Sequence, residues 1–595
     1  MHVVATAGHV DHGKSTLVRG LTGTEPDRWA EERRRGMTID LGYAWTELPS
    51  GEQVAFVDVP GHARFVGNML AGLGPAPAVL FVVAADEGWR RQSGEHLAAV
   101  DALGLSAGLL AVTRSDLADP APAIEEAREH LSRSSLGDVE AVAVSGQTGA
   151  GLDVLRAALD RLVARLPVPD TVGPVRLWVD RAFTVRGAGT VVTGTLGAGA
   201  LAVGDELELR GRRVRVRGLQ SLEQPRERMG AVARVAVALR GVERADVGRG
   251  DALLAPGRWR AASTLDVRLR PAGTLPERLV LHVGTAAVPV RLRPLRDDLA
   301  RLQLSTALPL RAGDRALLRD PAAQEVAAGV TVLDADPPDL RRRGSARERA
   351  AVLAGTTGPP DGIAEVERRG AVRRADLEAL GVPVPDGGRS AGGWLVSEQR
   401  WQVWRAELRR VVEQHDAVAP LDRGLPHDAA RRAAGIPDLA VLAAVAGDAE
   451  LVDEAGRLRS TQELGLGSAE PGVRALEERL TAGPFAAPER PDLDALGLDV
   501  RAVAAAAAAG RLLRLRASDG GDVVLLPDAP ARAMRELARL PQPFSLSAAR
   551  QALGTTRRVA VPLLEHLDAR GWTRRVDSSA REVVRGGSAA SGPPR

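Results

Sequence analysis

Over the first 165 residues, short apolar runs alternate with stretches that have a helical period. Uninterrupted apolar strands separated by helices are typical of a parallel sheet that is covered on both faces. We therefore predict a doubly wound α/β domain over residues 1–168. The predicted strands are VAFVDVP (54–60), AVLFVVAADEG (78–88), GLLAVTRSD (108–116) and AVAVSG (141–146), and the helical patterns include EEAREHL (125–131) and GLDVLRAALDRLVARL (151–166).

The period of the pattern changes near residue 174. From there to about residue 335, apolar and polar residues alternate in short segments with glycine turns, as in GTVVTGTL (189–196). Short alternating strands of this kind are typical of small barrels. We expect two β-barrels, over 172–258 and 259–338. The proline- and arginine-rich stretch DADPPDLRRRGS (334–345) is expected to be a linker.

From residue 346 onward helical patterns dominate, and one plan recurs along the chain. Each copy has a short helix that ends in Leu-Gly or Ala-Gly, then a second helix and an arginine-rich hairpin. This plan predicts winged helix-turn-helix modules. We interpret the first two copies, which are degenerate, as spacers. The predicted modules are 345–405, 406–470, 471–532 and 536–590.

Composition narrows the class of protein. The chain has 595 residues and a net charge of only +3, so a nucleic-acid partner must be argued from local clusters. It has no cysteine, which excludes disulfides, thiolate metal sites and a cysteine nucleophile. The N-terminus has no leader pattern, and no apolar run is long enough to span a membrane. We expect a cytoplasmic monomer without a membrane partner.

A phosphate-binding motif follows the first predicted strand. GHVDHGKS (8–15) fits G-x-x-x-x-G-K-[ST], in which backbone N–H groups and the lysine reach the phosphates and the serine hydroxyl reaches Mg²⁺. Lys14 is the single lysine of the chain. A point charge on a thin stem fits a tight loop better than the broad fork of arginine. The loop residues predicted to contact the nucleotide are Asp11, His12, Gly13, Lys14, Ser15 and Thr16.

Two further motifs complete the predicted phosphate and metal site. In DVPGH (58–62), Asp58 is expected to hold Mg²⁺ through water, and the Gly61 amide is expected to sense the γ-phosphate. In RGMTID (35–40), the Thr38 hydroxyl is expected to close over Mg²⁺ only when the γ-phosphate is present. Ser15 and Thr38 are thus the predicted direct metal ligands.

Two motifs after later strands predict selectivity for guanine. TRSD (113–116) places Asp116 where its carboxylate accepts bonds from N1–H and the 2-amino group of guanine. Adenine lacks both donors, so this carboxylate selects GTP. In SGQTG (145–149), the backbone of Ser145 and Gly146 is expected to meet the guanine O6.

Together these motifs resemble the five-motif nucleotide domain of the elongation factor Tu class of translational GTPases. The resemblance implies binding of GTP and GDP with Mg²⁺. The chain departs from that family in two places. Thr113 and Arg114 stand where the family has Asn-Lys, and Gly146 stands where alanine is usual. We expect the Arg114 stem to lie along the base.

The same resemblance implies the catalytic residue. In this class the histidine after D-x-P-G, here His62, orients the attacking water. Val10 and Met37 align with the apolar gate that keeps this histidine out until the ribosome triggers hydrolysis.

The remainder of the chain resembles one branch of this class, the bacterial selenocysteine-specific elongation factors of the SelB family. DRAFTVRGAGTVVTGTL (180–196) resembles the opening of their second domain, and LGTTRRVAVPLLEHLDARGWTRRV resembles their mRNA-binding winged helix. The resemblance implies that the GTP form binds selenocysteinyl-tRNA across domains 1–3. The last module would hold a selenoprotein mRNA hairpin beside an in-frame UGA codon, and contact with the ribosome would trigger hydrolysis and release of the tRNA.

Charge gives a physical reason for amino-acid selection. A selenol is an anion near pH 7, so cationic side chains favour it over the neutral hydroxyl of serine. Arg181 and Arg234, with Asp180 alongside, occupy the positions where the resembling factors place such residues. In the last module, arginines at a helix start and on a hairpin suit phosphate contact and base stacking. They are Arg557, Arg558, Arg574, Arg575 and Arg581.

Other functions fit parts of the same pattern. A general elongation- or initiation-type GTPase would bind bulk aminoacyl-tRNA or initiator tRNA. A nucleotide-sensing regulator would use its winged helices on DNA, which leaves the two predicted barrels unexplained. A protein–protein scaffold would use the degenerate modules as spacers.

Overall fold

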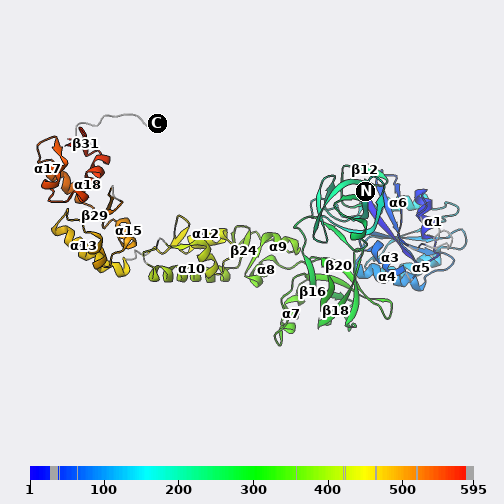
Figure 1. Cartoon of the computed structure of the whole chain (residues 1–595). Coiled ribbons are helices and arrows are strands. Elements are labelled where there is room, and N and C mark those ends of the chain that lie inside the picture. Colours follow the sequence, from blue (N-terminus) through cyan, green and yellow to red (C-terminus); the bar gives the residue numbers. More distant parts are fainter. Residues whose placement is uncertain are drawn as a thin grey trace. The chain divides into compact units, whose positions relative to one another are not determined.

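The computed structural model describes residues 1–26, 38, 40–62, 65–356, 358–419, 421–422, 424–461, 466–517 and 520–584. The chain divides into two compact units, Met1–Gly388 and Arg389–Arg595. Figure 1 follows the chain from the blue N-terminal sheet through the green barrels to the red C-terminal module. Among the described residues, no helix combines the length and the apolar character that crossing a bilayer requires.

The first domain is built on a six-stranded sheet with the order β2-β3-β1-β4-β5-β6. Helices α3, α4 and α5 pack on one face of it, and α1 and α6 pack on the other. Strands β1 and β3–β6 are parallel, which confirms the predicted α/β fold, while the edge strand β2 runs antiparallel to β3. The elements are β1 (His2–Gly8), α1 (Lys14–Thr22), β2 (Gly42–Glu47), β3 (Gln53–Asp58), α3 (Val66–Leu73), β4 (Ala78–Ala84), α4 (Arg91–Leu103), β5 (Gly108–Thr113), α5 (Ala121–Ser132), β6 (Glu140–Ala143) and α6 (Leu152–Ala164).

Two barrels follow, as the alternating pattern predicts. In the first, pairing of β10 with β11 closes the sheet β10-β15-β7-β8-β14-β11, and the second is the closed barrel β16-β19-β18-β17-β20-β21. The first contains β7 (Arg176–Val185), β8 (Gly189–Leu196), β9 (Ala200–Ala202), β10 (Glu206–Leu209), β11 (Arg212–Ser221), β12 (Gln224–Arg226), β13 (Arg228–Gly230), β14 (Ala233–Arg240) and β15 (Ala252–Leu254). The second contains β16 (Ala261–Arg270), β17 (Arg278–Val283), β18 (Ala286–Arg296), β19 (Leu299–Pro309), β20 (Arg315–Asp320) and β21 (Glu325–Asp334).

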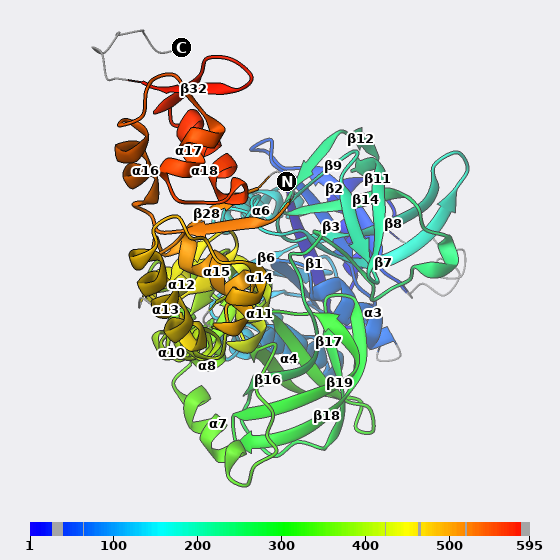
Figure 2. The same ribbon diagram turned by 60° about the vertical axis from the view of Figure 1, so that its left-hand side comes forward.

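Helix α4 packs against the second barrel, and both ribbon views place it beside this barrel (Figures 1 and 2). Arg315 donates to the carbonyl of Gly104 over 2.7 Å. Gly329 is so close that a Cβ there would lie 2.4 Å from the Ala102 carbonyl oxygen. Leu317 is fully buried in the same core as α4. The helix therefore lies between the first sheet and this barrel.

The prediction of a linker over 334–345 is wrong for its first residue. Asp334 ends β21 and is buried, and it pairs with Arg349 of α7 (Ser345–Ala354) over 2.6 Å. Arg349 also reaches the fully buried Asp266 over 2.7 Å, and Arg301 reaches the same carboxylate over 2.7 Å. Arg368 of α8 (Gly362–Arg369) lies 3.3 Å from Asp334. Paired charges thus hold this part of the chain against the barrel, which the proline- and arginine-rich composition did not indicate.

Short helices followed by hairpins make up the remaining chain, which agrees with the predicted winged-helix array. The hairpins with the described pairings are β23–β24, β26–β27, β28–β29 and β31–β32. Helix α10 runs through the predicted boundary at 405/406, and the two units divide at residue 388 within the first predicted module. The elements are β22 (Ala371–Arg373), α9 (Arg374–Ala379), β23 (Arg389–Ala391), β24 (Trp394–Val396), α10 (Glu398–Val418), β25 (Leu425–Pro426), α11 (His427–Ala433), α12 (Leu439–Asp448), β26 (Val452–Glu454), β27 (Arg457–Arg459), α13 (Glu470–Ala482), α14 (Arg490–Ala495), α15 (Val500–Ala508), β28 (Leu513–Arg516), β29 (Asp522–Leu525), α16 (Ala529–Leu537), β30 (Phe544–Ser545), α17 (Leu546–Ala552), α18 (Arg557–Ala569), β31 (Thr573–Arg575) and β32 (Ala580–Val583).

The last two predicted modules share one hydrophobic core. It includes Leu476 of α13, Leu537 of α16 and Leu563 of α18, all fully buried. Helix α16 spans the predicted boundary between 532 and 536, so the chain crosses that boundary as a continuous helix. Thr555 donates to the carbonyl of Phe485 over 2.6 Å, which adds a polar contact to the shared core. A fragment that begins at residue 536 would therefore expose part of this core.

Substitution of Arg349 by methionine should destabilise the second barrel. The change removes one arginine from two buried carboxylates, and each carboxylate keeps a second arginine. We expect the opening free energy to fall by about 3 kcal/mol, the lower end of the range for breaking a buried pair. Native-state hydrogen exchange of β16 and β21 amides measures it. Arg347→Met, an exposed arginine on the same helix, is the control, and equal effects of both would contradict the assignment.

Candidate functional site

A cavity of about 890 Å³ brings the predicted nucleotide residues together. It is lined by the loop after β1, by Thr38 and Gly61, and by the segments that follow β5 and β6. Of the predicted nucleotide and metal residues, its wall contains Asp11, Gly13, Lys14, Ser15, Thr16, Thr38, Gly61, Thr113, Arg114, Asp116, Ser145 and Gly146, together with the predicted gate residue Val10. His12 and Asp58 do not line it. Four further residues line the cavity and were not predicted from the sequence: Arg19, Glu25, Leu117 and Gln147. Leu117 and Gln147 directly follow predicted contacts.

The loop after β1 has the backbone that phosphate binding requires. Gly8 has a φ of 133°, and a Cβ there would lie 2.1 Å from the carbonyl oxygen of Val82. Lys14 is 6% exposed, and its Nζ donates to the carbonyls of His9 over 2.6 Å and Gly8 over 3.1 Å. The ammonium therefore lies within the curve of the loop. This enclosure supports the steric reason for a lysine, since a guanidinium needs more room.

Hydroxyl and carboxylate oxygens gather where Mg²⁺ is predicted. Ser15 Oγ donates to Asp58 Oδ2 over 2.7 Å and lies 2.9 Å from Thr38 Oγ1. Thr6 donates to the other carboxylate oxygen of Asp58 over 2.7 Å. Burial raises the pKa of the Asp58 carboxyl, while Lys14 and the two donor hydroxyls lower it. A hard cation prefers such an oxygen-only set, so these residues fit Mg²⁺.

The TRSD segment, which departs from the usual Asn-Lys, is hydrogen-bonded to the phosphate loop. Thr113 Oγ1 donates to the carbonyl of His12 over 2.7 Å. The Arg114 guanidinium reaches Asp86 over 3.0 Å and Glu87 over 2.8 Å, and it also donates to the Asp11 carbonyl. These partners hold the head of Arg114, and its side chain lines the cavity together with Asp116. Threonine and arginine thus connect the guanine segment to the phosphate loop.

Ser145 makes hydrogen bonds within the SGQTG loop itself. The Ser145 N–H donates to the Ala150 carbonyl over 2.9 Å, and Ser145 Oγ accepts from the Thr148 amide over 3.1 Å. Ser145 therefore folds the loop, and we expect the Gly146 amide to meet the guanine O6. A Cβ on Gly146 would lie 3.0 Å from Thr16 Cγ2, which is a close contact. Glycine at 146 fits the neighbouring Thr16.

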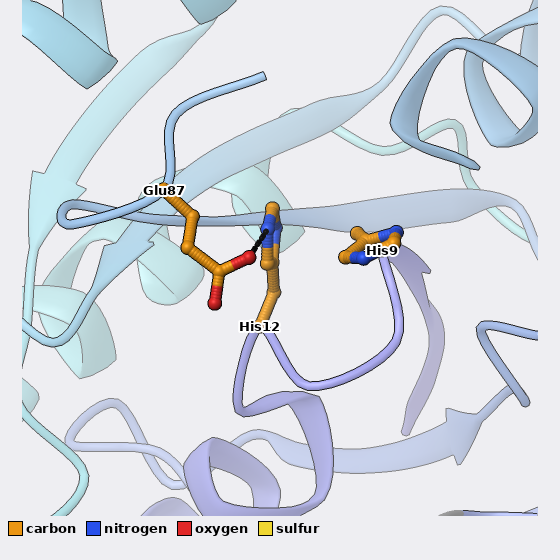
Figure 3. A group of neighbouring side chains, drawn as sticks. All are labelled: His9, His12 and Glu87. Atoms are coloured by element: carbon orange, nitrogen blue, oxygen red, sulfur yellow. Dashed lines mark ion pairs between the residues drawn. The ribbon is translucent and has the colours of Figure 1, made fainter. Parts of the chain in front are cut away.

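His12 does not face the nucleotide cavity. Its side chain is fully buried and, as Figure 3 shows, lies between His9 and Glu87. The His9 and His12 ring centroids are 4.9 Å apart, and His12 Nε2 is 3.7 Å from Glu87 Oε2. Burial lowers the pKa of His12 to about 4, so the imidazole is neutral near pH 7. Glu87 already pairs with Arg114, so a cation here would compete with an existing ion pair. We interpret the trio as packing behind the loop.

The residues around the predicted water-orienting histidine are only partly described. His62 is half-buried, with its ring centroid 6.1 Å from that of Phe65. Val10 lies against the residue before it, since a Cβ on Gly61 would be 2.5 Å from Val10 N. Met37, the other predicted gate residue, lies outside the described residues. One side of the predicted gate is therefore adjacent to Gly61.

Helix α4 supplies two residues that the sequence analysis missed. Gln92 Oε1 accepts from the Val10 amide over 3.0 Å, and His96 Nδ1 accepts from the Gly8 amide over 3.1 Å. His96 is buried, and burial lowers its pKa to about 3, which keeps it a neutral acceptor. Gln92 and His96 are four residues apart and so share a helix face. The spacing of these two residues gave no signal in the sequence, because the contacts join positions 82 and 88 residues apart.

The three predicted pocket residues lie together at the boundary between the first domain and the first barrel. Arg234 donates to both oxygens of Asp180, over 2.7 Å for Nη2 to Oδ1, and Thr193 donates to Asp180 over 2.6 Å. Strand β7 has a bulge between Val179 and Arg181, where its pairing with β8 shifts register. Arg181 is 22% exposed and pairs with Asp40 of the first domain over 3.0 Å.

Tyr43 of β2 is the residue of this pocket that the sequence analysis missed. The Cζ atoms of Arg234 and Arg181 lie 3.9 Å and 5.1 Å from its ring centroid. Burial raises the pKa of the Tyr43 hydroxyl, so it stays protonated near pH 7. An aromatic face beneath two guanidinium groups is favourable for both. The first domain therefore contributes a wall of the pocket.

The C-terminal arginines divide into exposed and structural side chains. Arg557 is exposed at the start of α18, whereas Arg558 donates to the carbonyls of Ala487 and Pro488 over 2.8 Å and 3.0 Å. Arg581 is buried and pairs with Asp568 over 2.9 Å, which ties the hairpin to α18. On the hairpin, Arg574 and Arg575 are exposed and pair with Glu582, and with Glu565 and Asp568, respectively.

Comparisons with known proteins match three parts of this chain to families. The family described as "Elongation factor Tu GTP binding domain" matches residues 1–165, "Selenocysteine-specific elongation factor, beta-barrel domain" matches 264–339, and "Elongation factor SelB, winged helix" matches 535–579. Elongation factor Tu 2 of Streptomyces avermitilis is 35% identical over 284 residues, 43% of this chain and 72% of that protein. A selenocysteine-specific elongation factor of Escherichia coli (strain K12) is 40% identical over 387 residues, 63% of this chain.

The chain belongs to the SelB family of the elongation factor Tu class. The alignment to the Escherichia coli SelB relative spans 62% of that protein's length. A solved bacterial selenocysteine-specific elongation factor, EF-Sec, matches 98% of this chain and 100% of its own with a TM-score of 0.78 and 24% identity. That likeness shows the SelB fold along almost the whole chain.

Thr113→Val should weaken nucleotide binding because it removes a hydroxyl and keeps the shape of the side chain. The His12 carbonyl then loses its bond from Thr113. We expect a loss of about 1–2 kcal/mol, roughly 5- to 30-fold in the dissociation constant for GTP. Equilibrium titration with a fluorescent GTP measures it. Thr46→Val, at the far end of β2, is the control, and an unchanged affinity for Thr113→Val would contradict the proposed link.

Proposed function

We propose that the chain is a translational GTPase that delivers selenocysteinyl-tRNA to the ribosome at in-frame UGA codons, tethered to an mRNA hairpin by its last winged helix. The observation that carries the proposal is the pocket of Arg181, Arg234 and Asp180 at the boundary between the nucleotide domain and the first barrel. Membership of the SelB family and the match of its winged helix support the same assignment.

The nucleotide site supports the GTP part of the proposal. Lys14 and the loop amides bind the phosphates, while Asp116 selects guanine and Arg114 flanks the base. Ser15 and Thr38 would hold Mg²⁺ directly, and Asp58 would hold it through water. The ion would neutralise charge on the phosphates. His62 orients the attacking water, and the contact that places it is made on the ribosome.

The pocket supports selection of selenocysteine. A selenolate would pair with two guanidinium groups. The neutral hydroxyl of a seryl ester would not offset the free-energy cost of removing water from these two groups. Asp180 pairs with Arg234 and holds it in place, since a bidentate pair fixes the plane of the guanidinium. Arg181 is therefore the pocket arginine whose positive charge is less tightly paired than that of Arg234.

The final module supports contact with RNA through exposed cations. Arg557 lies at a helix start, and Arg574 and Arg575 lie on the neighbouring hairpin. Such positions suit phosphate contact or stacking on a looped-out base. Arg558 and Arg581 act instead within the fold, so we remove them from the proposed direct contacts with the hairpin.

Arg181→Ala tests the proposed substrate. We expect the affinity of the GTP form for selenocysteinyl-tRNA to fall by about tenfold or more, the size of one charge-assisted bond, while the weaker binding of seryl-tRNA changes little. Binding of both tRNAs is measured with a nonhydrolysable GTP analogue. Arg186→Ala, an exposed arginine on the same hairpin, is the control. Equal losses for the two tRNAs would reject selenolate recognition, and tight binding of bulk aminoacyl-tRNA would favour a general elongation factor.

Arg557→Ala tests the proposed RNA contact. The variant should weaken binding of the mRNA hairpin and lower the slope of log K against log salt by about 1, because one phosphate contact is lost. Hairpin binding by the full chain across a salt series measures both quantities. Arg539→Ala is the control, since Arg539 is 74% exposed and lies outside α18. An unchanged salt slope for Arg557→Ala would rule out its phosphate contact.

A further inference from the structure

One short stretch of chain separates the metal-binding hydroxyls from the amino-acid pocket. At its start, Thr38 Oγ1 lies 2.9 Å from Ser15 Oγ, and at its end Tyr43 lies beneath the pocket arginines. The strand register places Gly42 opposite Asp58, and a Cβ on Gly42 would lie 3.2 Å from Asp58 Cβ. The two sites are therefore joined by the first residues of β2.

Asp40 is the charged residue between them, and both of its oxygens face arginines of the first barrel. Oδ2 lies 3.0 Å from Arg181 Nη2, and Oδ1 lies 3.7 Å from Arg249 Nη1. The same Nη2 of Arg181 donates to the Leu41 carbonyl. Arg249 also donates to Asn68 Oδ1 over 2.6 Å. Asp40 and Leu41 thus hold one edge of the Arg181 guanidinium.

The other edge of that guanidinium is left for a ligand. Within the described part of the chain, Arg181 Nε and the Tyr43 hydroxyl are buried and make no hydrogen bond. Buried donors without partners are costly, so each of them calls for an explanation such as a functional role or a bound group. Both donors belong to the pocket in which a selenolate is proposed to bind. Fixing one edge of Arg181 therefore orients the edge that still lacks a partner.

We propose that Asp40 is a positioning residue that transmits the nucleotide state to the selenocysteine pocket. This inference rests on the proposed function. With Thr38 beside Ser15, Asp40 pairs with Arg181 and fixes it above Tyr43. Thr38 would hold Mg²⁺ only while the γ-phosphate is bound, and it would move away when that phosphate is lost. Asp40 would then move with it, because two residues span at most about 7 Å of chain. Arg181 then loses its orientation, and the aminoacyl end is released.

Asp40→Asn in the full chain tests this coupling. The wild type should bind selenocysteinyl-tRNA more tightly with a nonhydrolysable GTP analogue than with GDP. In the variant, affinity with the analogue should fall about tenfold toward the GDP value, the loss expected for one charge-assisted hydrogen bond. Affinity for GDP, affinity for the analogue and the GDP-state binding of tRNA should stay unchanged. Glu47→Gln is the matched control, since it removes an exposed carboxylate from the far end of β2.

A second readout needs no tRNA. Hydrogen exchange of the β7 amides around Arg181 should be slower with the GTP analogue than with GDP in the wild type, and this difference should disappear in Asp40→Asn. An unchanged ratio of tRNA affinities, or tighter binding in both nucleotide states, would overturn the coupling. If the wild type does not bind selenocysteinyl-tRNA preferentially, the proposed function fails, and the exchange difference still decides whether Asp40 links the two sites.

Discussion

The hydrogen bond between Ser15 and Asp58 is the contact on which the arrangement of this molecule depends. It joins the start of α1 to the end of β3, and Thr6 of β1 holds the other oxygen of the same buried carboxylate. Three elements therefore meet at one charge that is kept from solvent. Breaking it would leave one oxygen of a buried carboxylate without its donor, which is costly. Because Gly42 of β2 pairs with Asp58 at this point, the position of Asp58 also fixes the start of the strand that places Tyr43 beside the proposed amino-acid pocket.

Arginine takes on several roles in this chain because a planar, permanently charged group can bond at one edge and stack on its face. Arg114 uses this property to attach the guanine segment to Asp86 and Glu87, and Arg349 uses it to bridge two buried carboxylates. Lys14 is the exception, because its Nζ lies among loop carbonyls within a tight turn. The choice between the two cations in these examples therefore follows the room available. Arg114 and Arg349 lie where a guanidinium can bond to several partners, and Lys14 lies where a loop encloses the charge.

Local patterns in the sequence predicted the fold class and the nucleotide motifs well, because these depend on residues close together in the chain. The apolar strands, the phosphate loop and the alternating barrel strands are of this kind. Contacts between distant segments were not predictable in the same way. Tyr43 beneath Arg234, His96 at the Gly8 amide and Asp334 on Arg349 each join elements far apart in sequence. The sequence showed which arginines the C-terminal module contains, but only the packing in the structure distinguished exposed Arg557 from buried Arg581.

The shared core of the last two modules bears on how the proposed RNA-binding end is built. Leu476, Leu537 and Leu563 come from helices before, at and after the predicted boundary, so the final winged helix does not complete its hydrophobic core alone. Arg558 adds to this by bonding to carbonyls of the preceding module from the start of α18. The neighbouring Arg557 is on the same helix turn and is exposed. The helix that presents the proposed RNA contact is therefore anchored by the module before it, and the preceding module is part of the scaffold that positions Arg557.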